Sequence, residues 1–130
     1  MNENVKYWLD LADYDIETAK VMLNSGRYLY VGFMCHQTVE KALKAAIAQD
    51  CVEDEIPPKI HNLVRLSDIS RLTEKMSPEQ SALLEKMNPL NIEARYPSYK
   101  NQLAAKLTND YCQGLVIETK ELLCWIKQQL

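Results

Sequence analysis

The stretch YLYVGFMCHQTVEKALKAAIAQDC, residues 28–51, decides the fold. Its apolar side chains fall on most sides of a helix: Leu29, Val31, Phe33, Met34, Val39, Ala42, Leu43, Ala46 and Ile47. A helix that is apolar nearly all the way round is covered by its neighbours. We therefore predict that residues 28–51 form a central helix on which the other elements pack.

The segments on either side also have helical periodicity. Residues 4–24 carry an apolar stripe at steps of three or four, and Gly26 suits the left-handed position that follows a helix. A shorter helix is expected over residues 62–72. Another is expected to begin at Ser77, because Ser caps a helix and Pro78 fits the first turn.

The C-terminal third is expected to form one last and longest helix, over residues 101–130, with Leu103, Leu107, Tyr111 and Leu115 on its apolar stripe. No segment alternates apolar and polar residues as a half-exposed strand does. The chain is therefore predicted to be a single all-α domain over residues 1–130, an up-and-down bundle of about five helices.

Composition excludes several classes of protein. The net charge of −3, from 15 basic and 18 acidic side chains, leaves nucleic-acid binding to a local patch. No signal peptide and no membrane span is predicted, and four cysteines without a C-x-x-C pair are expected to be reduced thiols in the cytoplasm. With only two histidines, neither a metal site nor a cofactor is expected.

The central helix places two ionisable residues on an apolar stripe. His36 and Glu40 are four residues apart and therefore share one face. They are either a buried polar pair that fixes packing, or a base and the acid that orients it. Lys41 and Lys44 are interpreted as part of a solvated face.

The segment PPKIHNL, residues 57–63, places His61 and Asn62 where a helix begins. One of them caps that helix, or its amides form an anion site together with Lys59 and His61.

A second interruption, EARYP at residues 93–97, precedes the last helix. Arg95 can bind phosphate through two parallel hydrogen bonds, and Tyr96 offers a ring for base stacking. We expect residues 88–101 to belong to the functional site and to place the guanidinium of Arg95 beside Glu40 as its counter-charge. The alternative is that the segment is only a connector, in which Arg95 contacts carbonyl groups of two helices and holds them together.

Taken in order, HQTVEKALKA, PPKIHNL and EARYP resemble the HEPN domain family. The resemblance implies a compact α-bundle that is usually dimeric. Many members are encoded beside a minimal nucleotidyltransferase as a toxin–antitoxin pair, others are ribonucleases, and some bind nucleotides. A surplus of apolar residues also favours a homodimer: Met22, Tyr28, Tyr30, Met34 and Trp125.

The ribonuclease branch of the family uses an Arg followed, after four to six residues, by a His. No His follows Arg95 in this sequence, and Arg27 lies too far before His36. The expected function is therefore a non-catalytic HEPN module that acts with a minimal nucleotidyltransferase partner. It would bind the phosphate of a nucleotide or RNA through Arg95, Lys59 and His61, and the ring of Tyr96 would stack on a base.

Two other functions stay open. The first is a ribonuclease toxin with an atypical site, in which Arg95 stabilises the scissile phosphate and His36 or His61 is the base. The second is a helical scaffold whose only role is to dimerise.

Overall fold

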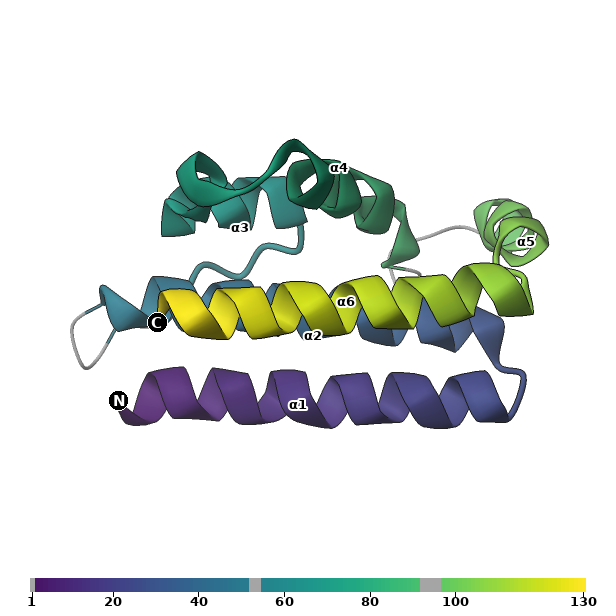
Figure 1. Ribbon diagram of the computed structural model, residues 1–130, viewed down its shortest axis with the longest axis horizontal. Coiled ribbons are helices and arrows are strands. Elements are labelled where there is room, and N and C mark those ends of the chain that lie inside the picture. Colours follow the sequence, from purple (N-terminus) through teal and green to yellow (C-terminus); the bar gives the residue numbers. More distant parts are fainter. Residues whose placement is uncertain (1, 52–54, 92–96) are drawn as a thin grey trace.

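The computed structural model describes residues 2–51, 55–91 and 97–130 (Figure 1). Throughout these ranges the regular structure is helical, which confirms the all-α prediction. The elements are α1 (Glu3–Asn24), α2 (Tyr28–Gln49), α3 (Leu63–Ser70), η1 (Leu72–Lys75), α4 (Pro78–Met87), η2 (Asn88–Leu90), α5 (Pro97–Lys106) and α6 (Asn109–Gln129), where η denotes a short 3-10 helix.

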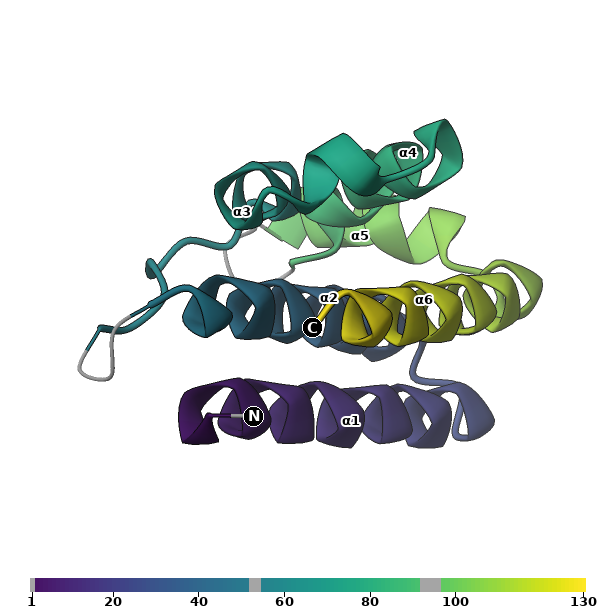
Figure 2. The same ribbon diagram turned by 60° about the vertical axis from the view of Figure 1, so that its left-hand side comes forward.

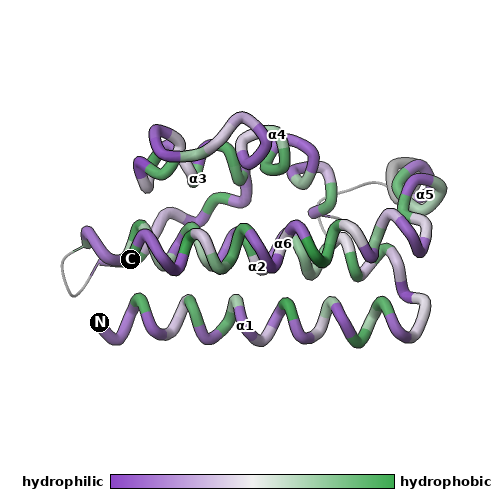
Figure 3. The backbone as a smooth tube through the Cα atoms, viewed as in Figure 1, coloured by the Kyte–Doolittle hydropathy of each residue, from purple (hydrophilic) through white to green (hydrophobic). Residues whose placement is uncertain are grey.

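Helix α2 is the centre of the molecule, as its apolar composition predicts. It contacts α1, α3, α4, α5 and α6. In Figures 1 and 2, α1 forms a layer of its own, α2 and α6 lie side by side above it, and α3, α4 and α5 form a third layer. Figure 3 shows hydrophobic and hydrophilic residues alternating within the turns of α1, as expected for a helix with one buried face.

Local chemistry explains several helix ends. The Asn2 side chain accepts a hydrogen bond from the Val5 amide and so caps α1. Gly26 has a φ of 75°, which confirms the left-handed position predicted after α1. Ser77 and Gln80 form a reciprocal capping box at the start of α4, and Pro78 stands in its first turn.

The prediction of one last helix over residues 101–130 is wrong. The chain forms α5 and α6 instead, with a break at Leu107 and Thr108. The Thr108 side chain accepts a hydrogen bond from the Tyr111 amide at 3.3 Å and thereby caps α6. The apolar stripe continues across the break, with Leu103, Leu107 and Leu115 all buried, so hydrophobic periodicity alone could not reveal the interruption.

None of the described helices combines the length and the apolar character that a membrane span requires.

Candidate functional site

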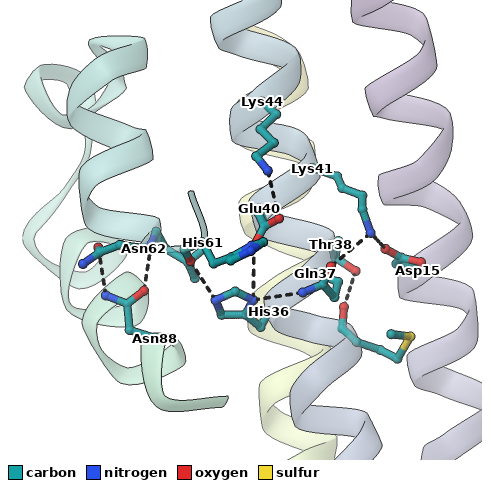
Figure 4. Close-up of polar contacts among 12 residues, drawn as sticks. Asp15, His36, Gln37, Thr38, Glu40, Lys41, Lys44, His61, Asn62 and Asn88 are labelled. Atoms are coloured by element: carbon teal, nitrogen blue, oxygen red, sulfur yellow. Dashed lines mark hydrogen bonds and ion pairs between the residues drawn. The ribbon is translucent and has the colours of Figure 1, made fainter. Parts of the chain in front are cut away.

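A buried carboxylate on α2 is the centre of the most elaborate polar cluster that the structure describes (Figure 4). Glu40 is only 3% exposed. Its Oε2 accepts a hydrogen bond from Lys44 Nζ at 3.1 Å, and its Oε1 lies 2.9 Å from Nδ1 of His61. A buried charge is costly without partners, and these two side chains supply them.

Lys44 corrects the prediction that it belongs to a solvated face. Its side chain is 8% exposed, because it lies one turn after Glu40 on the same face of α2. Its ammonium also lies 5.5 Å from the centre of the Trp8 ring on α1, a distance at which cation–π attraction operates. Lys41 is likewise paired, with Asp15 of α1 at 2.6 Å. Both lysines therefore hold structure together.

His61 is held from two directions. Because a carboxylate can only accept hydrogen bonds, the proton between His61 and Glu40 sits on Nδ1 of His61. The backbone carbonyl of His61 accepts a hydrogen bond from Nε2 of His36 at 3.1 Å. The His61 side chain is nevertheless 61% exposed. Side chain and backbone are thus fixed while Nε2, which has no hydrogen-bond partner among the described residues, is left accessible.

His36 is fully buried, and its Nδ1 lies 3.9 Å from Glu40 Oε1. This is an ion-pair distance and too long for a hydrogen bond. The sequence correctly placed His36 and Glu40 on one face, but Glu40 hydrogen-bonds His61 rather than His36. At 0% exposure His36 has no contact with solvent, so it acts on His61 through the backbone.

Two asparagines next to His61 have fixed side-chain orientations. Asn62 caps α3: its Oδ1 accepts from the Arg65 amide at 3.1 Å. The Leu63 amide donates to Oδ1 of Asn88 at 2.7 Å, and Nδ2 of Asn88 donates to Oδ1 of Asn62 at 3.2 Å. Oδ1 of Asn62 accepts two hydrogen bonds and Oδ1 of Asn88 accepts one, and Nδ2 of Asn88 donates one, so each NH₂ group keeps at least one N–H without a partner among the described residues.

A hollow of about 180 Å³ lies at this place. It is lined by His61, Asn62, Asn88 and the largely buried Asn91. Donors on its wall favour an anionic oxygen as ligand. Two backbone amides at the start of α3 do not add to these donors. Because the Leu63 and Arg65 amides are already satisfied by Asn88 and Asn62, they are not available for the anion site predicted at the start of α3.

The structure brings together only some of the residues that the sequence singled out. His36, Glu40 and His61 form one cluster, and Lys59 is exposed two residues before His61. Arg95 and Tyr96 lie outside the described residues, so their predicted roles stay predictions. Sequence reasoning missed Lys44, Asn88 and Asn91. The spacing of four between Glu40 and Lys44 was a usable signal for the first, whereas nothing local marks the asparagines.

No group of three or more His, Cys, Asp or Glu side chains is arranged as metal ligands in the described ranges. The cysteines are all free thiols. Burial raises the pKa of Cys35 to about 12 and that of Cys112 to about 11.

The cluster therefore stands on a helical bundle built around one buried helix, α2. The HEPN domain model matches residues 5–129, and the chain belongs to that family. No curated protein sequence matches the chain significantly.

Two solved structures share the fold. TT1696 from Thermus thermophilus is 16% identical, with a TM-score of 0.78 over 99% of this chain and 100% of that one. ST0689, an archaeal HEPN homologue, is 18% identical, with a TM-score of 0.70 over 99% of this chain and 98% of that one. At these identities the likeness concerns the fold alone.

Proposed function

We propose that this chain is a non-catalytic HEPN module that binds the phosphate of a nucleotide or RNA at His61 and works with a minimal nucleotidyltransferase partner. One observation carries the binding part: an exposed imidazole, anchored by a buried carboxylate, stands beside a hollow whose asparagines offer donors. The partner and a homodimeric state rest on membership of the family.

The chemistry of the hollow favours phosphate over a neutral ligand. The proton on Nδ1 of His61 is committed to Glu40. When the imidazole is protonated, Nε2 carries a second N–H that points away from Glu40 and can donate to a phosphate oxygen. Asn62 and Asn88 add neutral donors, and the exposed Lys59, two residues before His61 in the chain, is the nearest cation in the sequence.

Calorimetric titration with AMP tests this proposal. Wild-type protein is expected to bind AMP, and His61→Ala to weaken binding about tenfold or more, as expected when a hydrogen bond to a charged group is lost. Lys120→Ala, on the exposed side of α6, removes one positive charge elsewhere and is the matched control. Equal affinities for wild type and His61→Ala would contradict the proposal.

A ribonuclease is the second candidate, and the same geometry favours it. An imidazole that is oriented by a carboxylate and free at Nε2 is suited to act as a general base, so His61 is the candidate base and the buried His36 is not. Incubation of total RNA with wild-type protein and with His61→Ala separates the two candidates. Cleavage that depends on His61 supports the enzyme, and intact RNA supports the binding module.

A further inference from the structure

A second hollow lies at the N-terminal end of α2. It measures about 300 Å³ and is formed where the turn between α1 and α2 meets the junction of α5 and α6, at the right of Figure 1. Its lining is mostly apolar and aromatic: Gly26, Arg27, Tyr28, Leu29, Tyr30, Ala104 and Leu107. We call it the Arg27 groove. Its size is at the lower end of the range for small-molecule sites, which fits one flat ring.

Among the described residues that line the groove, Arg27 alone is charged. Arg27 is exposed and forms no ion pair with any described residue. Tyr30 is 53% exposed, so much of its side chain is accessible. The hydroxyl of Tyr28 accepts a hydrogen bond from Nδ2 of Asn109 at 2.9 Å, which fixes that ring against α6. Two tyrosines beside an exposed arginine match a stacked base next to a phosphate.

The groove and the His61 hollow are both linked to one side of α2, through Leu29 and Glu40, although the residues between them on that side, Phe33 and His36, are buried. Leu29, Phe33, His36 and Glu40 follow one another at steps of three or four, so the face that carries Glu40 continues to the groove. Leu29 and Glu40 are separated by about 16 Å of helix, at 1.5 Å per residue. A mononucleotide is too short to reach both sites, whereas several linked nucleotides of one strand can span them.

We infer that the Arg27 groove is a second subsite that takes an unpaired nucleobase and its phosphate from the same RNA strand whose other phosphate binds at His61. The inference rests on the proposed function and narrows its ligand from any nucleotide to single-stranded RNA several nucleotides long. An acidic peptide is the competing ligand. It would satisfy Arg27 but would make no use of the aromatic rings.

The experiment compares binding of fluorescent hexaadenylate with binding of AMP. Arg27→Ala and Tyr30→Ala are each expected to weaken hexaadenylate binding about fivefold or more, the low end for losing one stacked base. AMP binding at His61, followed by the NMR signal of the His61 imidazole, is expected to stay within about twofold of wild type. Tyr14→Ala is the control for Tyr30→Ala, because Tyr14 is an exposed tyrosine on α1, and Lys120→Ala is the charge control for Arg27→Ala.

The outcomes separate this inference from the proposed function. Unchanged hexaadenylate binding by both groove variants, with AMP binding still lost in His61→Ala, overturns the groove and leaves the proposed function standing. Hexaglutamate that competes for the groove as well as hexaadenylate does also overturns it. Wild-type protein that binds neither AMP nor hexaadenylate overturns both. Circular dichroism of each variant shows that the helices are intact.

Discussion

Oε1 of Glu40 lies 2.9 Å from Nδ1 of His61, which joins a buried carboxylate on α2 to an exposed imidazole before α3. The contact determines which nitrogen of His61 carries the proton and leaves Nε2 toward solvent. His36 donates a hydrogen bond to the backbone carbonyl of His61, and Lys44 provides the counter-charge for the Glu40 carboxylate. The orientation of His61 therefore depends on one buried acid and on the groups that hold it.

Glu40→Gln is expected to destabilise the protein by about 3–5 kcal/mol, because the buried ammonium of Lys44 then has no counter-charge. Urea unfolding measures the change. The double variant Glu40→Gln/Lys44→Met is expected to recover most of the loss, since no charge is left unpaired. Lys86→Met, which breaks the more exposed pair with Glu118, is expected to cost at most about 1 kcal/mol. A double variant less stable than Glu40→Gln alone would contradict this account.

Asn62→Asp separates the two roles of Asn62. Asp caps a helix as well as Asn does, so the free energy of unfolding is expected to stay within about 0.5 kcal/mol of wild type. The side-chain N–H donors, however, are replaced by a carboxylate oxygen, and we expect AMP affinity to fall about tenfold or more. Asn62→Ala, in contrast, is expected to cost about 1 kcal/mol of stability. Unchanged AMP binding by Asn62→Asp would show that the Asn62 amide does not contact the ligand.

Two glycines are expected to respond to Ala in opposite directions. Gly26 has a φ of 75°, where a Cβ costs about 1–2 kcal/mol, so Gly26→Ala should lower the melting temperature. Gly114 lies inside α6, and a Cβ built there meets no atom within 4 Å. Gly114→Ala is therefore expected to stabilise the protein by up to about 1 kcal/mol. Calorimetry in which both variants shift the melting temperature in the same direction would contradict the boundaries of α1 and α6.

The thiols are expected to react in an order set by burial. In native protein at pH 8 a thiol reagent should label the exposed Cys124 first, and Cys35 only after unfolding. Burial raises the pKa of Cys35 from 9.0 to about 12. The folded state therefore keeps this proton to higher pH than the unfolded state does. The contribution of Cys35 to stability is complete below about pH 9 and is lost as pH rises toward 12. Labelling of Cys35 in the native protein as fast as that of Cys124 would contradict the burial of Cys35.

Local sequence signals were enough to predict some helices and helix ends, but not others. The α1 and α2 stripes, Gly26 and the Ser77 cap act within a few residues, and each prediction agrees with the structure. The division between α5 and α6 depends on Thr108, whose capping signal is weaker than the continuous apolar stripe around it.

The candidate site was harder to predict, because its geometry depends on chain packing. Nothing near His61 in the sequence shows that its side chain turns back to Glu40, 21 residues earlier, rather than capping α3. The cap is Asn62 instead. The expectation that Arg95 supplies the cation for Glu40 overlooked Lys44, which was within reach on the same helix face.

The most direct measurement is a ¹H–¹⁵N spectrum of the imidazole and side-chain amide groups during titration with AMP. The free protein is expected to show His61 protonated on Nδ1, in keeping with its contact with Glu40. Addition of AMP should then shift Nε2 of His61 and the NH₂ signals of Asn62 and Asn88, while the NH₂ signal of Gln129 at the end of α6 stays in place. A titration in which AMP leaves the His61 and Asn62 signals unmoved would contradict a phosphate site at this pair.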